Sequence, residues 1–339
     1  MYFDIAICII TYNRGKRALE NVENILKNIK KNFCVLVLNN GSNLGVEEYK
    51  RIEDLSKENS QLFYKRHDTN TQFYGNFRSC FDFNNSKYIM ILSDEDFVNI
   101  DGLDDILNDL KNYNNVAACR TSIEPHKDLI TPGNSYIYPN EYFMAGVSAL
   151  NGFSFFGNYI SGIIYNLELI KKTDLLNILD KNITLHKAYP HMYFDIITTS
   201  KVAVLEREAE QTLIENGTSK ISSAHIGLYG YPERTKQFLA FRDAIQQSVE
   251  LVGLKTDGEK INLFINLFFK LVYKYFFLIF EANINNYTSN YMEKTLLMES
   301  FFYLISSSVV EHPYIGSNQA IVTDYLIKIY QEHKERLLN

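Results

Sequence analysis

The sequence has few cysteines, no excess of positive charge and no basic segment at its start, and each absence excludes a class of protein. The four cysteines form no C-x-x-C pair, so a zinc site is not expected, and their wide spacing predicts reduced thiols in a cytoplasmic protein. The formal net charge of −6 provides no basic field that would attract nucleic acid. The first residues lead directly into an apolar run, which predicts a first strand and not a secretion signal.

Buried-strand patterns alternate with amphipathic-helix patterns in the first third of the chain. Continuous apolar runs predict strands at 4–12, 33–38, 61–65, 88–92 and 116–122. Apolar residues at three- and four-residue spacing predict helices at 14–30, 45–58, 74–84 and 103–110. Strands that alternate with helices indicate βαβ units and a mostly parallel sheet.

The pattern changes in the second half of the chain. Residues 130–165 are rich in glycine and in loop signals, although 158–165 predict a strand that returns to the sheet. From about residue 233 onward the pattern is helical. We therefore expect an α/β domain over residues 1–232 and a C-terminal helical region over residues 233–339.

Three polar clusters follow predicted strands directly. They are Thr11-Tyr12-Asn13, Asn39 to Ser42, and Ser93 to Asp96. Ligands of parallel sheets bind beyond the carboxyl ends of the strands. The three clusters should therefore meet in one crevice although they are far apart in the sequence.

The order of these clusters resembles the family-2 glycosyltransferases. The motifs are I-I-T-Y-N-R ending at Arg14, L-N-N-G-S ending at Ser42, Asn70 followed by G-N-F-R ending at Arg78, and L-S-D-E-D ending at Asp96. The resemblance covers residues 3–100 well and 100–225 loosely, and it does not cover 235–339. It implies a GT-A fold, which is a Rossmann-like, mixed but mostly parallel sheet flanked by helices. It also implies a nucleotide-sugar half at about 1–100 and an acceptor half at about 101–232.

Asp94 and Asp96 have the D-x-D spacing that the family uses to hold a divalent metal on the donor diphosphate. Carboxylates suit a hard ion such as manganese or magnesium, which neutralises the charge that develops on the leaving group. The alternative is an acidic cap of the following helix. Ser93 departs from the family, because relatives often have an acidic residue there. The resemblance also makes His225 a further metal or diphosphate ligand, with an ordinary surface loop as the alternative.

The resemblance assigns the nucleotide-sugar donor to residues near the first two strands. The assigned residues are Thr11, Tyr12, Asn13, Asn39, Asn70, Arg78 and Asp94. Asn39 stands where relatives usually have an aspartate that accepts from uracil. A UDP- or dTDP-sugar is the default donor, with UDP first. Because an asparagine amide donates as well as accepts, a CDP-sugar stays open. For Arg78, a solvated position on a helix face is an equal alternative.

The catalytic base is less clear from the sequence, because the Glu-Asp pair of the inverting relatives is missing. The comparable stretch starts a helix at Pro190 and contains His191 and, one turn later, Asp195. The ordinary pKa of histidine, near 6.5, suits proton abstraction at neutral pH. His191 and Asp195 are therefore both candidates, and a structural role for both is the alternative.

Residues 261–280 form a strongly apolar segment. Asn262, Asn266, Lys270 and Lys274 form one polar stripe on a helix, and lysines near mid-span make a membrane-spanning helix costly. The interpretations are a core or dimer helix and a monotopic membrane contact. We expect the apolar face to be covered, either by other C-terminal helices such as 294–310 and 320–331 or by a second subunit.

Together these features predict a metal-dependent, inverting glycosyltransferase of the hexosyltransferase type. The resemblance implies transfer from a nucleotide-sugar to a hydroxyl of a bacterial capsule, O-antigen or other surface glycan. It implies a cytoplasmic enzyme, with peripheral contact to the inner face of the membrane and a homodimer as open options. The rival hypothesis is a catalytically inactive scaffold or binding module in a polysaccharide assembly complex, which the Ser93 and Asn39 departures motivate.

Overall fold

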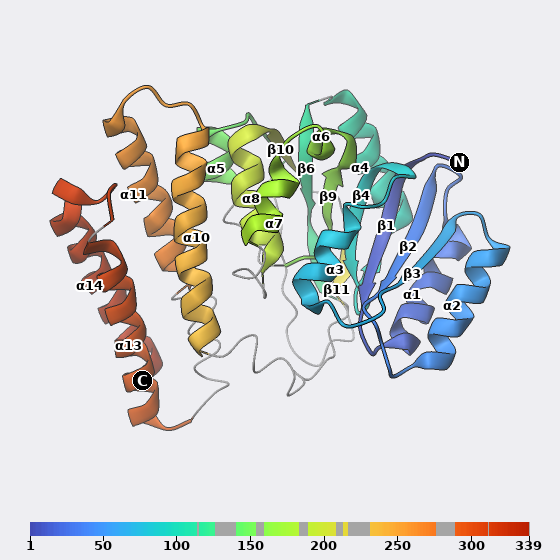
Figure 1. Cartoon of the computed structure of the whole chain (residues 1–339), viewed down its shortest axis with the longest axis horizontal. Coiled ribbons are helices and arrows are strands. Elements are labelled where there is room, and N and C mark those ends of the chain that lie inside the picture. Colours follow the sequence, from blue (N-terminus) through green and yellow to red (C-terminus); the bar gives the residue numbers. More distant parts are fainter. Residues whose placement is uncertain are drawn as a thin grey trace.

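The structure is a computed structural model of the chain (Figure 1). It describes residues 1–113, 115–125, 140–153, 159–182, 189–207, 213–215, 231–275, 289–310 and 312–338. His225 lies outside these residues, as does the end of the predicted helix 261–280.

An eight-stranded sheet has the order β3-β2-β1-β4-β9-β6-β10-β8. Its strands are β1 (Phe3–Thr11), β2 (Phe33–Asn39), β3 (Leu62–Arg66), β4 (Ser86–Ser93), β6 (Val116–Thr121), β8 (Glu141–Phe143), β9 (Ile163–Asn166) and β10 (Ala203–Arg207). β9 runs antiparallel to both β4 and β6, and β8 runs antiparallel to β10, while the other pairs are parallel. The predicted GT-A type of sheet, mixed but mostly parallel, is confirmed.

A second sheet of three short strands has the order β5-β11-β7. These strands are β5 (Phe97–Val98), β7 (Ile123–Pro125) and β11 (Leu213–Glu215). β5 begins directly after the acidic loop, so this sheet lies next to the predicted D-x-D motif.

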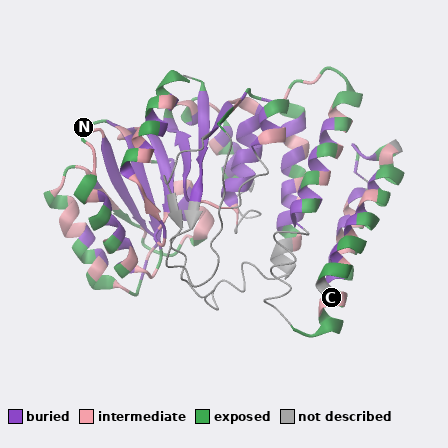
Figure 2. Ribbon diagram, turned by 180° about the vertical axis from the view of Figure 1, so that it is seen from behind, coloured by how far each residue is buried: buried purple, intermediate pink, exposed green. Residues whose placement is uncertain are grey.

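Helices cover both faces of the large sheet (Figures 1 and 2). One face packs against α1 (Gly15–Asn28), α2 (Val46–Glu58) and α4 (Ile100–Asn112). The other face packs against α3 (Gln72–Cys80), α5 (Val147–Gly152), α6 (Leu167–Lys171), α7 (Leu175–Asn182) and α8 (Pro190–Lys201). Residues of α8 are buried from Pro190 to Ser200, because the helix lies between the sheet and further helices.

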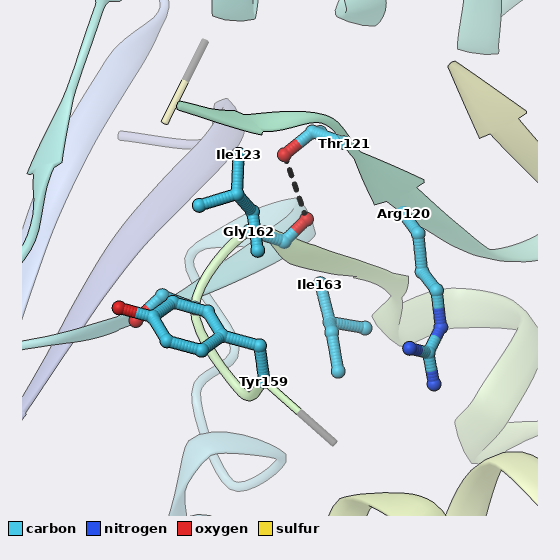
Figure 3. A pocket seen from close by; sticks show the side chains of 7 residues that line it. Arg120, Thr121, Ile123, Tyr159, Gly162 and Ile163 are labelled. Carbon is cyan, nitrogen blue, oxygen red and sulfur yellow. Dashed lines mark hydrogen bonds between the residues drawn. The ribbon is translucent and has the colours of Figure 1, made fainter. Parts of the chain in front are cut away.

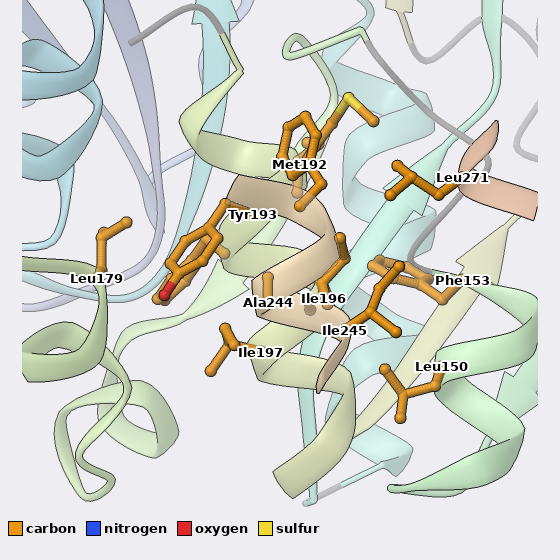
Figure 4. Close-up of a cluster of buried hydrophobic side chains, with 14 of the residues drawn as sticks. Leu150, Phe153, Leu179, Met192, Tyr193, Ile196, Ile197, Ala244, Ile245 and Leu271 are labelled. Carbon is orange, nitrogen blue, oxygen red and sulfur yellow. The ribbon is translucent and has the colours of Figure 1, made fainter. Parts of the chain in front are cut away.

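The C-terminal region is helical, as the sequence predicts. Its elements are α10 (Tyr231–Leu251), α11 (Asp257–Lys274), α13 (Tyr291–Val310), the 3-10 helix η3 (Gly316–Asn318) and α14 (Gln319–Leu338). α10 packs on α8, and α11 packs on α10, α5 and α14. Figure 4 shows apolar side chains of α5, α8, α10 and α11 meeting in one cluster. The hydrophobic core is therefore continuous from the sheet into these helices.

The apolar face of α11 is covered within the chain, as expected. Phe264, Leu267, Phe268 and Leu271 are buried, and Tyr325 of α14 stacks on Phe269 at 3.9 Å between ring centroids. Within the described residues, none of the helices combines the length and the apolarity that crossing a membrane requires.

The prediction of a polar stripe on α11 is wrong at one position. Asn262, Asn266 and Lys270 are exposed, whereas Lys274 is only 5% exposed. The last turn of α11 reaches the charged groups of Arg120 on β6 and Asp195 on α8. Burial, reinforced by the positive charge of Arg120, lowers the pKa of Lys274 to about 7.

The buried Lys274 should make stability depend on pH. Its pKa is about 7 in the folded chain and 10.5 ordinarily, so the unfolded chain binds more protons between these values. Stability contributed by this group therefore rises from about pH 7 toward pH 10.5. In urea titrations, we expect the unfolding free energy of wild type minus that of Lys274→Met to rise with pH across that window. The exposed Lys255→Met is the control, and parallel pH profiles for wild type and Lys274→Met would contradict the assignment.

Candidate active site

The carboxyl ends of β1, β2 and β4 meet at one edge of the sheet, as predicted. In the strand register, Thr11 lies opposite Asn39 and Ile10 lies opposite Ser93. The loops that follow these three strands carry the three polar clusters, which therefore lie together.

Asn13 locks the loop after β1 to the loop after β2. Its backbone has φ 57°, a left-handed conformation that asparagine tolerates better than most residues. Its Oδ1 accepts from the backbone N–H groups of Asn43 (2.9 Å) and Leu44 (3.1 Å), and its own N–H donates to Ser42 Oγ (2.8 Å). Asn13, a predicted nucleotide ligand, thus has a clear role in organising the loops.

The two loops approach so closely that only glycine fits at the contact. A Cβ atom at Gly15 would lie 2.4 Å from the carbonyl oxygen of Gly45. This contact sets α1 against the start of α2, and it fixes where the loop after β1 presents its side chains.

Asn39 ends β2 beneath the three loops, which together form the predicted crevice, and it is 1% exposed. Its Nδ2 donates to the Tyr64 hydroxyl (2.8 Å), and its Oδ1 accepts from the Ser42 N–H (2.9 Å). Thr11 Oγ1 is hydrogen-bonded to the Tyr49 hydroxyl (2.6 Å), whereas the Tyr12 side chain is 40% exposed. Each polar atom of the Asn39 amide therefore has one partner within the protein, which formally leaves one acceptor and one donor position.

Asn40 ties the crevice to the loop after β3. Its Nδ2 donates to Asn70 Oδ1 (3.0 Å), and its Oδ1 accepts from the backbone N–H (2.9 Å) and the hydroxyl (2.7 Å) of Thr71. The structure thus places the predicted Asn70 beside the crevice. Sequence reasoning assigned no role to Asn40, although it stands within the quoted L-N-N-G-S motif.

The two carboxylates of the D-x-D motif have different surroundings. Asp94 Oδ1 accepts from Arg14 Nη1 (3.1 Å), while Asp94 Oδ2 is buried without a hydrogen-bond partner. Burial raises the pKa of Asp94 to about 6, against the opposing effects of Arg14 and of the nearby Thr11 hydroxyl. Asp96, in contrast, accepts from the hydroxyls of Tyr159 at Oδ1 (2.7 Å) and Ser161 at Oδ2 (2.6 Å).

Arginines from α1 face the acidic loop, and sequence reasoning gave them no role. Arg14 Nη1 lies 3.1 Å from both Asp94 Oδ1 and Glu95 Oε1. Arg17 Nη1 lies 3.3 Å from Glu95 Oε2. The crevice therefore contains acidic and basic groups in direct contact.

These residues fit a divalent metal in part. Asp94 Oδ2, which accepts no hydrogen bond, is a hard oxygen ligand, and the carboxylate of Asp96 is a second oxygen donor of the same chemical type. In the described part of the chain, no three His, Cys, Asp or Glu side chains are arranged to hold a metal together. A metal here would need oxygen ligands from a bound diphosphate.

A small pocket adjoins Asp96 (Figure 3). Tyr159 and Ser161 line it and also bind Asp96. The Thr121 hydroxyl donates to the Gly162 carbonyl (3.3 Å) on the same wall. The walls of the pocket thus come from β6, β9 and the two residues that bind Asp96, in the half predicted to bind the acceptor.

Both predicted base residues are buried on α8. Asp195 is 0% exposed; it pairs with Arg120 and accepts from the Tyr165 hydroxyl (2.8 Å). Burial raises the pKa of Asp195, although Arg120 and the Tyr165 hydrogen bond oppose the rise. His191 is 1% exposed, with the rings of Phe73, Phe77 and Tyr189 around it.

Arg78 takes part in a surface contact between helices. Its Nε lies 2.7 Å from Asp180 of α7, and its Nη1 lies 2.9 Å from Asp82. The pair with Asp180 joins α3 to α7, and both pairs favour the helix-face alternative for Arg78.

The family model described as Glycosyl transferase family 2 matches residues 6–172 of the chain. This stretch runs from β1 to the end of α6 and contains all three loops of the crevice. The chain therefore carries a family-2 glycosyltransferase domain. No curated protein sequence gives a significant match to the chain.

Solved structures similar to this chain extend the comparison beyond that domain. S. aureus TarS 1–349 has a TM-score of 0.60 and 11% identity, covering 98% of this chain and 90% of that one. S. aureus TarS 1–349 in complex with UDP-GlcNAc has a TM-score of 0.60 and 11% identity, covering 98% and 91%. At this identity the likeness concerns the fold alone, and it includes the C-terminal helices.

Two replacements of Asn13 should separate the contribution of its side-chain hydrogen bonds to stability from that of its backbone conformation. Asn13→Ala loses two accepted hydrogen bonds and strains a left-handed position, so we expect a loss of about 2 kcal/mol in unfolding free energy. Asn13→Asp keeps an acceptor oxygen and should lose markedly less. Urea denaturation measures both, and equal losses for the two variants would show that the side-chain oxygen does not organise the loops.

Proposed function

We propose that the chain is an inverting glycosyltransferase that moves a sugar from a nucleotide-diphosphate sugar to an acceptor hydroxyl. The observation that carries this proposal is the buried D-x-D pair at the end of β4, beside the loops of β1 and β2, within a family-2 domain. A UDP-sugar is the first choice of donor. TarS, whose fold is similar, has been solved in complex with UDP and with UDP-GlcNAc, which supports this choice.

The donor would lie over the ends of β1 and β2. Tyr12 offers an exposed ring, and Asn39 offers one acceptor and one donor position to the base. Thr11, Asn13 and Asn70 shape this floor through their hydrogen bonds to neighbouring loops. Because Asn39 can donate as well as accept, a CDP-sugar stays the second candidate.

Asp94 and Asp96 would hold a divalent ion, manganese or magnesium, together with the diphosphate. Such an ion supplies charge neutralisation to the leaving diphosphate. Asp94 contributes its partnerless oxygen, and Tyr159 and Ser161 orient Asp96. His225 is retained as a proposed further ligand.

For the proton acceptor we propose His191 in preference to Asp195. Both oxygens of Asp195 are engaged, by Arg120 and by Tyr165, so this carboxylate is better suited to holding α8 on the sheet. His191 lies in the first turn of α8, enclosed by aromatic rings. Access of an acceptor to His191 requires Phe73 or Tyr189 to shift.

The acceptor side of the proposal comes from the family resemblance. We propose a hydroxyl of a bacterial capsule, O-antigen or other surface glycan, a cytoplasmic location with peripheral membrane contact, and a homodimer as an option. We also retain the division into residues 1–232 and 233–339. The rival is an inactive scaffold, which the absence of an acidic pair at the start of α8 favours.

The variant Asp96→Asn should distinguish an active glycosyltransferase from an inactive scaffold. We expect manganese-dependent release of UDP from a UDP-sugar to fall about 100-fold, because one of the two carboxylates that would hold the charge-neutralising ion is lost. Tyr159→Phe removes only a hydroxyl donor to Asp96 and is the matched control, with most activity kept. A wild-type protein that releases no nucleotide from UDP-, CDP-, dTDP- or GDP-sugars would support the scaffold.

His191→Ala should lower turnover by about 100-fold or more with little change in nucleotide affinity, as expected for a general base. Asp195→Asn should instead reduce stability, because Arg120 loses its buried partner. Turnover and thermal unfolding are measured for both variants. Unchanged turnover in His191→Ala would remove this residue from the mechanism.

A further inference from the structure

The guanidinium of Arg14 lies directly against the D-x-D motif. One nitrogen, Nη1, lies 3.1 Å from Asp94 Oδ1 and 3.1 Å from Glu95 Oε1. The other oxygen of Asp94, Oδ2, is buried and partnerless. A divalent ion on Asp94 would therefore stand close to a guanidinium that is always charged.

The backbone of Arg14 is anchored, whereas its side chain reaches the surface in part. Its N–H donates to the Tyr49 hydroxyl (3.1 Å) at the start of α1. The side chain is 27% exposed. In the part of the chain that the structure describes, the contacts of the guanidinium are made through Nη1, which leaves Nε and Nη2 as donors for an anion.

Glu95 offers Arg14 a second partner when Asp94 is taken by a metal. Glu95 is also bound by Arg17 (3.3 Å), and it keeps two positive charges beside the crevice. Arg14 can therefore leave Asp94 without losing all its counterions, and its free N–H groups can turn to a diphosphate.

We propose that Arg14 is a displaceable counterion of Asp94, which yields this carboxylate to a divalent ion and moves to the donor diphosphate. The proposal rests on the proposed function. It means that metal alone binds weakly, because it must displace Arg14, and that nucleotide and metal bind cooperatively, because the diphosphate takes over the arginine.

The experiment measures Mn²⁺ and UDP binding by calorimetry in wild type, Arg14→Gln and Arg17→Gln. Arg14→Gln should bind Mn²⁺ alone about fivefold tighter or more, since one charge-paired competitor is gone. The same variant should bind UDP with Mn²⁺ more weakly than wild type. Arg17→Gln removes the same charge, and the ion pair described for Arg17 is with Glu95 and not with Asp94. The Mn²⁺ affinity of this variant should therefore change little.

Asp94→Asn tests whether Arg14 affects Mn²⁺ binding through the carboxylate of Asp94. In the double variant Arg14→Gln with Asp94→Asn, the gain in Mn²⁺ affinity should disappear, because it acts through this carboxylate. Equal gains in Arg14→Gln and Arg17→Gln would show a general charge effect and overturn the proposal, as would no gain in Arg14→Gln. If wild type binds no nucleotide with Mn²⁺, the proposed function fails, whereas the comparison with Mn²⁺ alone still decides the exchange at Asp94.

Discussion

The burial of β1 between β2 and β4 is the constraint on which the site depends. Its residues from Ile5 to Thr11 are all buried, because apolar side chains fill both faces of the strand. A shift of one residue in the pairing of β1 would turn every side chain to the opposite face of the sheet. Because both faces are tightly filled, the register is strongly specified. That register places Thr11 beside Asn39 and Ile10 beside Ser93, and it thereby decides which polar loops meet.

A buried group of charges links the C-terminal helices to this sheet. Arg120 on β6 pairs with Asp195 on α8, and Lys274 on α11 lies within their field. Desolvation offsets much of what such contacts contribute to stability. Their stronger consequence is geometric, because displacing α8 or α11 would leave a buried charge without its neighbours. The helices beyond residue 230 therefore share the core of the domain whose loops form the crevice.

The sequence predicted the local features of this fold and missed the non-local ones. β1, β2, β3, β4 and β6 follow from apolar runs, since periodicity is a property of neighbouring residues. The direction of β9 between β4 and β6 depends on distant partners and has no local signal. Lys274 fits the exposed stripe by spacing, but its burial depends on how α11 meets the sheet. Motif order located Asp94 and Asp96, whereas the contact of Arg14 joins residues 80 positions apart.

Asp94 and Asp96 have different partners, and this difference explains how an acidic crevice can admit an anionic diphosphate. Tyr159 and Ser161 orient Asp96 through neutral hydroxyls, which bring no positive charge to it. Arg14 instead brings a positive charge to Asp94 and Glu95. The free crevice therefore presents less negative charge than its acidic sequence suggests, and the approach of a diphosphate meets less repulsion. The same arginine makes Asp94 the adjustable carboxylate of the pair and Asp96 the fixed one.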